Sequence, residues 1–174
     1  MKKSKDKTNV MRILDSKNIE YKCYSYEADA TLTGVDVAHR LNKDENSVFK
    51  TLVTVGKSKE HYVFVIPVNK ELDLKKASKA VSEKNISMLK SRDLLALTGY
   101  IHGGCSPIGM KKPFKTVFHY TISNLYTITF SAGKIGYQVE FKNEDLSKVI
   151  DYSTGDICVA VSYTHLTLPT TPYV

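Results

Sequence analysis

The chain has 174 residues, of which 42% are hydrophobic and 25% are charged. This length suits one domain with a hydrophobic core and is short for two, and the composition excludes a largely disordered chain. No run of about 18 apolar residues occurs, so the sequence predicts no membrane-spanning helix.

Basic residues exceed acidic ones, since 25 Lys and Arg against 18 Asp and Glu give a formal net charge of +7. Counterion release favours the binding of basic surfaces to phosphates, so a polyanionic partner such as nucleic acid is one interpretation. Surface lysines that only keep the protein soluble are the other. Charge alone does not decide between them.

The cysteines and the first residues bear on the compartment. Cys23, Cys105 and Cys158 are widely spaced and form neither a disulfide framework nor a CxxC pair. The basic leader of residues 1–7 precedes no apolar segment of the kind that a secretory signal contains. Both observations favour a cytoplasmic protein.

Two helices and one extended segment are predicted before residue 45. Apolar residues at helical spacing predict a helix over 8–18, with Thr8 as its N-cap. The tyrosine-rich residues 20–29 are predicted to be extended. Thr33, followed three residues later by Asp36, forms a capping-box pattern that predicts a helix over 33–42.

Two β-branched runs follow, at 48–55 and 61–68, and predict a pair of strands. The second run is apolar almost throughout, which indicates a central strand buried on both faces. Helical spacing predicts a helix over 73–82, and a shorter helix is predicted from Ser91 to Gly99, a residue suited to a left-handed end.

The last part of the domain is predicted to be rich in strands. Three strands are predicted at 115–122, 125–133 and 136–141, the last two joined by a tight hairpin, and a helix at 143–150 follows. Strands outnumber helices and do not alternate with them regularly. The sequence therefore predicts a single α+β domain and argues against a doubly wound sheet.

Residues 161–174, VSYTHLTLPTTPYV, differ from the rest of the chain because they contain no Asp, Glu, Lys or Arg. Their Pro- and Thr-rich steps continue neither a helix nor a strand. We expect the folded domain to cover 8–158 and residues 159–174 to be a tail that is not native to the protein.

Common nucleotide and metal motifs are absent from the sequence. It lacks GxxxxGK[ST], GxGxxG and HExxH, and its five histidines have no metal-ligand spacing. Cys105 has only His102 near it in sequence as a candidate base, whereas a reactive thiol needs a base or a cationic setting. An unreactive, buried cysteine is therefore the favoured interpretation.

Lys50 is a charged residue in an otherwise apolar predicted strand. Its ammonium must pair with another group or lie in a wet cleft. Strand alternation places it on the face of Val48 and Leu52, which is the core face if Phe49 and Val53 point outward.

A second feature is the loop GGCSPIG at 103–109. Its glycines allow the backbone to approach a ligand closely, and successive free N–H groups of such a loop can bind a carbonyl or anionic oxygen. Lysines in strands and glycine-rich loops are both common, so neither feature is specific alone.

Taken together, these features resemble the YbaK/EbsC family of aminoacyl-tRNA deacylases, free-standing proofreading domains related to the editing insert of bacterial prolyl-tRNA synthetase. The matching segments are FKTLV at 49–53, LDLKKASKAV at 72–81, TGYIHGGCSPIG at 98–109, KK at 111–112 and FSAGKIGYQVE at 130–140. The resemblance covers residues 8–157 and implies a mixed, barrel-like sheet with peripheral helices. It is strongest to the YbaK branch, which removes cysteine attached to proline tRNA.

Residue roles are implied by the same resemblance. Lys50 corresponds to the family's essential lysine, and Gly103 and Gly104 to the loop that holds the substrate, so these three are the expected catalytic residues. The residues implied to bind substrate are Tyr26, Thr51, Ser106, Pro107 and Ser131. Cys105 stands where relatives often have an aliphatic residue and matches no catalytic position. We expect neither a metal nor a cofactor.

The implied substrate is an aminoacyl ester on the terminal ribose of tRNA. Such an ester is already activated, so positioning it and stabilising charge on its carbonyl oxygen are the main tasks. Backbone N–H groups near Gly103 and Gly104 suit the second task, and Lys50 suits binding to phosphate or ribose oxygens. For a cysteinyl ester, the resemblance implies attack by the substrate's own thiol.

Alternative functions stay open at this point. A sibling deacylase could clear alanine from proline tRNA, because a small pocket separates such substrates by only ~1–3 kcal/mol. A non-catalytic module could instead bind tRNA or a synthetase. The expected partners are mischarged tRNA, through its acceptor end, and prolyl-tRNA synthetase, and cysteine on tRNA(Cys) is a further implied substrate. No membrane partner is expected.

Overall fold

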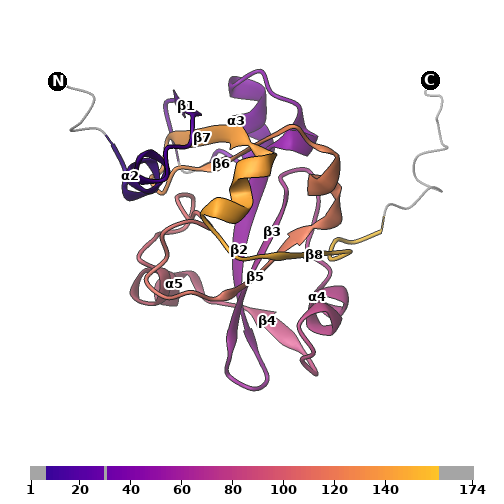
Figure 1. The fold of residues 1–174 in the computed structure, drawn as a ribbon. Helices are drawn as coiled ribbons and strands as arrows, with labels where there is room; N and C mark the ends of the chain where they lie inside the picture. Colours follow the sequence, from indigo (N-terminus) through magenta and orange to yellow (C-terminus); the bar gives the residue numbers. More distant parts are fainter. Residues whose placement is uncertain (1–6, 30, 161–174) are drawn as a thin grey trace, which may run out of the picture.

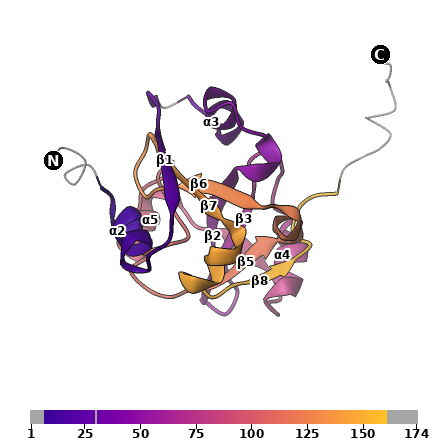
Figure 2. The same ribbon diagram turned by 45° about the horizontal axis from the view of Figure 1, so that its top comes forward.

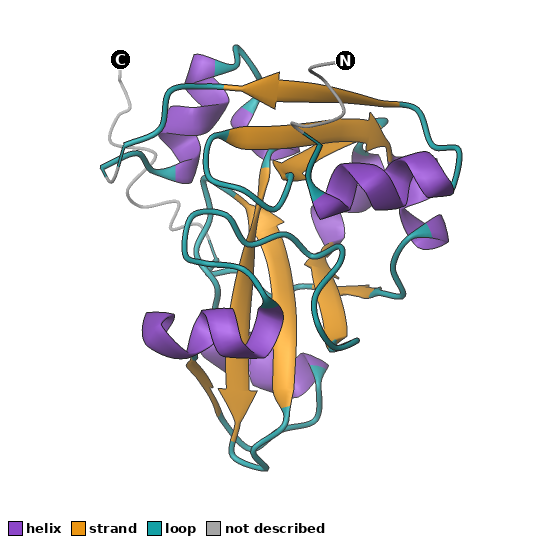
Figure 3. Cartoon of the chain, turned by 90° about the vertical axis from the view of Figure 1, so that its left-hand side faces the viewer, coloured by secondary structure: helices purple, strands orange, loops and turns teal. Residues whose placement is uncertain are grey.

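The computed structural model describes residues 7–29 and 31–160. Within these residues two sheets are surrounded by short helices, which confirms the predicted α+β class (Figure 1). The strands form two sheets where we expected one, and the two are joined by an isolated parallel bridge between Val48 and Thr129. In Figure 3 the strands of the smaller sheet run across those of the larger one.

The smaller sheet is antiparallel throughout. Its strands, in spatial order, are β1 (Tyr21–Ser25), β7 (Tyr137–Lys142) and β6 (Thr127–Ser131). The predicted hairpin between β6 and β7 is present, and Gly133 and Gly136 in its turn both have φ of +92°. Residues with a side chain rarely adopt this conformation, so the turn depends on its glycines.

The larger sheet is mixed, since β2 and β3 are antiparallel whereas β3, β5 and β8 are parallel. Its strands, in spatial order, are β4 (Ile86–Met88), β2 (Phe49–Gly56), β3 (His61–Pro67), β5 (Lys115–His119) and β8 (Ser153–Gly155). The middle of β3, from Val63 to Ile66, is 1% exposed or less. The prediction of a central strand buried on both faces is therefore confirmed.

The helices begin where local sequence predicts. They are α2 (Asn9–Ser16), α3 (Gly34–Arg40), α4 (Leu74–Ala80) and α5 (Ser91–Thr98). The side chain of Thr8 caps α2, Thr33 and Asp36 form a complete capping box on α3, and Gly99, at φ +89°, ends α5. Figure 2 shows α2 and α5 on one side of the strands and α4 on the other.

Two predicted elements differ in type, over all or part of their length, from those observed. The strand expected over 115–122 ends at His119 and continues as the 3-10 helix η2 (Tyr120–Asn124), and the helix expected over 143–150 is the 3-10 helix η3 (Asn143–Lys148). The Asn143 side chain donates hydrogen bonds to carbonyls at residues 122 and 125. These bonds fix the start of η3 against the end of η2, and tertiary contacts of this kind are invisible to local patterns. The third 3-10 helix, η1 (Glu45–Ser47), lies just before β2.

Two main hydrophobic clusters lie on opposite faces of β2. The larger one contains Phe49 and Val53, and the smaller one packs against Leu52. Phe49 and Val53 therefore point into the larger core, and Lys50 points to the opposite face together with Leu52. This outcome settles the two orientations that strand alternation left open for Lys50.

The ends of the chain are only partly described. Most of the predicted leader (1–7) and most of the predicted tail (159–174) lie outside the described residues. The N–H of Val159 donates to the carbonyl of Glu71 at 2.8 Å, so backbone pairing continues one residue past the expected end at 158. No helix in the described part of the chain has the length and apolarity that a membrane span requires.

Candidate active site

A cavity of about 540 Å³ has walls from both sheets. The larger sheet contributes β2, the smaller sheet contributes β6 and β7, and loops before α3 and after α5 complete the wall. Five of the eight predicted site residues line it, namely Tyr26, Lys50, Thr51, Gly103 and Ser131. The volume lies within the range that is usual for small-molecule sites.

The edge of β2 explains how neighbouring residues share one cavity. On one side β2 pairs with β3 along its length, whereas on the other side β4 pairs only with Thr54–Gly56. From Lys50 to Leu52 that second edge has no strand neighbour. Lys50 and Thr51 therefore both reach the cavity, although their side chains leave opposite faces of the strand.

Lys50 is a partly buried cation in the cavity wall. Burial holds the pKa of Lys50 below its usual value, and the negative charge of Glu71 opposes this effect. Within the described residues its ammonium makes neither a hydrogen bond nor an ion pair. A desolvated cation without a protein partner is suited to bind an anionic or carbonyl oxygen of a ligand.

Two buried oxygens of the cavity wall also lack protein partners. They are Oγ1 of Thr51 and Oε1 of Gln138. Gln138 lies in β7 and is only 7% exposed. Sequence reasoning missed this residue: it falls within the segment FSAGKIGYQVE, but a glutamine in a strand gives no signal of its own.

The glycine-rich loop enters the cavity at Gly103, which has φ of +89°. The N–H of Gly104 donates to the carbonyl of Ile101 at 3.0 Å, so it is not free for a ligand. Within the described chain, the N–H groups of Gly103 and Cys105 have no protein acceptor. These two groups, and not the expected Gly103 and Gly104, are suited to bind a carbonyl oxygen.

Gly104 allows the loop to pack closely against the β6–β7 hairpin. A Cβ at this position would lie 3.0 Å from the backbone nitrogen of Ile135 and 3.3 Å from the carbonyl carbon of Lys134. The loop therefore approaches the β6–β7 hairpin at backbone distance, which only glycine permits without a shift.

Ser106 and Pro107 are buried behind the loop and do not line the cavity. Ser106 is fully buried, and its Oγ accepts a hydrogen bond from the N–H of Ile108 at 3.3 Å. The structure thus places both residues where they shape the loop. Ser131 does line the cavity, but its Oγ accepts from the N–H of Gly133 at 3.1 Å.

Cys105 lines the cavity, and burial raises the pKa of its thiol to about 12. The thiol is therefore protonated at neutral pH and is a poor nucleophile. We expect Cys105→Ala to change kcat/KM for an aminoacyl ester by about threefold or less, because no covalent step needs the thiol. Steady-state kinetics would test this, with exposed Cys23→Ala as the control. A loss similar to that of removing a nucleophile would contradict it.

Three residues at the mouth of the cavity were not predicted: Asp29, Thr33 and His102. Hydrogen bonds from the side chain and backbone of Thr31 lower the pKa of Asp29, which stays ionised. Thr33 is already used as the cap of α3. Asp29 thus supplies one negative charge at the mouth, in contrast to the positive charge of Lys50 inside.

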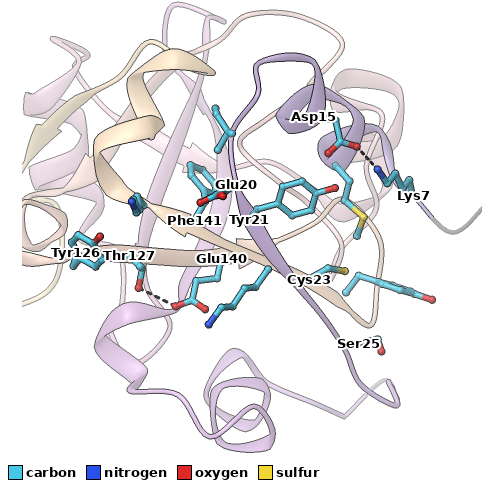
Figure 4. Close-up of a pocket in the computed structure, with 15 residues that line it drawn as sticks. Lys7, Asp15, Glu20, Tyr21, Cys23, Ser25, Tyr126, Thr127, Glu140 and Phe141 are labelled. Carbon is cyan, nitrogen blue, oxygen red and sulfur yellow. Dashed lines mark hydrogen bonds and ion pairs between the residues drawn. The ribbon is translucent and has the colours of Figure 1, made fainter. Parts of the chain in front are cut away.

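A second, more open cavity of about 1080 Å³ runs along β1 (Figure 4). None of the eight predicted residues lines it. Two of its acids are already paired: Asp15 with Lys7, and Glu140 with Lys43 at 2.9 Å. Burial raises the pKa of Glu140, but hydrogen bonds from Tyr24, Lys43 and Thr127 outweigh it and hold that pKa below its usual value.

The smaller cavity is the better candidate site. Its wall holds a lysine and two buried oxygens without partners, whereas two of the three acids of the larger cavity, Asp15 and Glu140, form internal pairs. Unpaired buried polar groups require an explanation, and a ligand supplies one. Residues 7–29 and 31–160 contain no cluster of three or more His, Cys, Asp or Glu that could hold a metal ion.

Comparison with known proteins decides the family. The sequence profile of the aminoacyl-tRNA editing domain matches residues 28–149. This chain belongs to the aminoacyl-tRNA editing domain family. Residues 28–149 include the cavity-lining residues of the editing domain from β2, β6, β7 and the Gly103 loop.

A curated relative from Enterococcus faecalis shares 46% identity over 157 residues, which is 90% of this chain and 96% of the relative. It is provisionally named Cys-tRNA(Pro)/Cys-tRNA(Cys) deacylase EbsC. This match extends the similarity well beyond the segments quoted above and confirms the resemblance to the YbaK/EbsC family.

Two solved structures show the same fold at low identity. One is provisionally described as a trans-editing enzyme for prolyl tRNA synthetase and has a TM-score of 0.75 at 19% identity, covering 88% of this chain and 99% of its own. The other, the hypothetical protein APE2540, has a TM-score of 0.78 at 18% identity, covering 87% and 100%. At these identities the likeness establishes the fold of the editing domain.

Proposed function

We propose that this editing domain removes cysteine from mischarged tRNA(Pro), and also from tRNA(Cys), in the cavity beside β2. The observation that carries the proposal is the wall of that cavity, where Lys50 and two free N–H groups can bind oxygens but no nucleophile and base lie ready. Family membership and the name of the Enterococcus relative support the substrate class.

Lys50 is assigned to the acceptor end of the tRNA. Its ammonium has three donors and no partner among the described residues, so it can bind a phosphate or ribose oxygen of the terminal nucleotide. The N–H groups of Gly103 and Cys105 bind the ester carbonyl oxygen and stabilise the charge that develops on it. A cavity of about 540 Å³ has room for an aminoacyl group and part of the terminal nucleoside.

The substrate's own thiol supplies the nucleophile in this proposal. The cysteinyl sulfur, after losing its proton to water, forms a bond to the ester carbonyl carbon. The bond from that carbon to the ribose oxygen breaks, and the ribose oxygen takes up a proton. The products are uncharged tRNA and a cyclic thioester of cysteine, which water later opens. The protein contributes geometry and charge stabilisation.

Recruitment and compartment belong to the same proposal. A domain of this size contacts a small part of a tRNA, and its +7 charge attracts phosphates without reading sequence. We propose that prolyl-tRNA synthetase brings the substrate, and that the enzyme acts in the cytoplasm, where tRNA is charged.

A panel of charged tRNAs tests the proposal. We expect Cys-tRNA(Pro) to be deacylated about 10-fold or more faster than Ser-tRNA(Pro) or Ala-tRNA(Pro), because only the cysteinyl ester carries a nucleophile. Release of the amino acid would be followed with protein truncated near residue 160. Equal rates on all three esters would rule out thiol assistance. Preference for the alaninyl ester would identify a sibling deacylase.

A further inference from the structure

Gln138 holds a buried hydrogen-bond acceptor without a partner in the wall of the candidate active site. In β7 it faces Tyr24 of β1 and Ser131 of β6, and its side chain lines the cavity. Its Nε2 donates to the hydroxyl of Tyr26 at 3.5 Å, which leaves Oε1 directed at no protein donor. The residue is 7% exposed, so water does not freely replace the missing partner.

Thr51 lines the same cavity from the other sheet, and its Oγ1 is also buried without a partner. The described residues contain three such side-chain atoms, and the third belongs to Thr121 in η2, away from the cavity wall. A buried polar atom without a partner destabilises the fold, so two of them in one cavity wall indicate the position of a ligand. Gln138 Oε1 can only accept a hydrogen bond, whereas the Thr51 hydroxyl can accept or donate one, so the ligand group must be a donor to Gln138.

The chemistry of an aminoacyl ester limits what that group can be. Its ester oxygens only accept hydrogen bonds, a thiol is a weak donor, and a ribose hydroxyl has one proton to donate. The α-amino group has at least two N–H donors, so it can donate to Gln138 Oε1 and keep a second donor for Thr51 Oγ1. Lys50 would repel an amino group in its charged form and the carboxylate of Asp29 would attract it, but Gln138 and Thr51 supply the buried oxygens of the wall that lack a partner.

We propose that Gln138 Oε1 and Thr51 Oγ1 bind the free α-amino group of the aminoacyl ester, and that this contact restricts the enzyme to amino acids whose amino group is unblocked. An N-acylated ester has a single amide N–H and an added carbonyl in an enclosed space. It can therefore donate to only one of the two oxygens. Peptidyl-tRNA and formylated tRNA carry blocked amino groups, so the enzyme would not cleave their ester bonds.

This inference rests on the proposed deacylase function, and the test separates the two. Cys-tRNA(Pro) and N-acetyl-Cys-tRNA(Pro) are compared as substrates, because acetylation keeps the thiol, the carbonyl and the ester in place. For the wild-type protein we expect kcat/KM to be about 10- to 100-fold lower with the acetylated substrate. Equal values for the two substrates would overturn the proposal.

Variants of Gln138 supply the second part of the test. Gln138→Met keeps the length of the side chain but has no comparable acceptor, so it should lower kcat/KM for Cys-tRNA(Pro). The already low kcat/KM for the acetylated substrate should stay within about twofold of the wild-type value. Gln138→Glu keeps an acceptor and adds attraction for an ammonium, so it should preserve the discrimination. If Gln138→Met slows both substrates in the same proportion, the residue is only structural and the proposal fails.

Two controls keep these outcomes distinct. Thr51→Val removes the hydroxyl with little change in shape, and it should reduce the ratio of kcat/KM for Cys-tRNA(Pro) to kcat/KM for N-acetyl-Cys-tRNA(Pro). Urea unfolding should show that Gln138→Met is folded, because the substitution removes a buried amide oxygen that has no partner. If Cys-tRNA(Pro) loses no cysteine in a Lys50-dependent manner, the proposed function fails and this inference fails with it. Lys50-dependent cleavage of both substrates at equal rates overturns the amino-group contact alone.

Discussion

Replacing Lys50 by methionine is expected to raise KM for Cys-tRNA(Pro) and to lower kcat/KM about 10- to 100-fold, the usual value of a hydrogen bond to a charged group. The reason is that the Lys50 ammonium lines the cavity, has no protein partner among the described residues and so is free to bind the acceptor end. If binding is its task, kcat should change less than KM.

The kinetic pattern separates binding from proton transfer. A general base acts on the chemical step, so its loss would lower kcat at saturating substrate while KM stayed the same. Lys50→Arg is the matched control, because it keeps the charge and changes the shape of the donor group. We expect it to retain more activity than Lys50→Met. A loss confined to kcat would contradict the binding role.

Stability gives an independent check on the same variant. Burial lowers the pKa of Lys50, which means that its charged form is destabilised in the folded protein. Methionine removes that cost, so the free energy of unfolding of Lys50→Met should equal or exceed that of the wild type. Impaired folding would instead indicate an ion pair that the described residues do not contain.

Replacing Phe118 by alanine is expected to lower the free energy of unfolding by about 3–5 kcal/mol. Phe118 is fully buried in β5 and is one of the largest side chains of the main core. Its ring lies 5.0 Å from that of Tyr152 and 6.3 Å from that of Phe49, measured between centroids. A loss of this size is a large fraction of the stability of a domain, which is typically about 5–15 kcal/mol.

The effect of Phe118 reaches the candidate site through Phe49, which directly precedes Lys50 in β2. Urea unfolding would measure the loss, and Phe118→Leu is the control, with an expected cost of about 1–2 kcal/mol because it leaves a smaller cavity. If Phe118→Ala costs less than about 1 kcal/mol, the ring is not packed against Phe49 and Tyr152 as described.

Local sequence predicted those elements whose causes are local. Thr8 and Thr33 cap helices by contacts within three residues, and the glycines of the β6–β7 turn act within the hairpin. Strands β4 and β8 were not predicted. Each has three residues, too few for a periodic pattern, and each exists through pairing with a distant strand.

The candidate site, like the fold, was predicted only where a residue gives a signal in the local sequence. Lys50 was singled out because a charge in an apolar strand contradicts burial, whatever the tertiary structure. Gln138 was not, because its unpaired amide oxygen depends on what packs around it. Gly104, in contrast to Gln138, was predicted as a site residue that offers its N–H to the substrate. In the structure that N–H already donates to the carbonyl of Ile101.

The central claim is that the acceptor end binds in the cavity beside β2 and not in the larger one along β1. NMR titration of isotope-labelled protein with a cysteinyl amide of 3′-amino-3′-deoxyadenosine, an uncleavable mimic of the charged tRNA end, tests it most directly. We predict that the amide resonances of Lys50, Thr51, Gly103 and Gln138 shift on binding. Shifts confined to the wall of the larger cavity, at Lys22, Cys23 and Tyr126, would contradict the account.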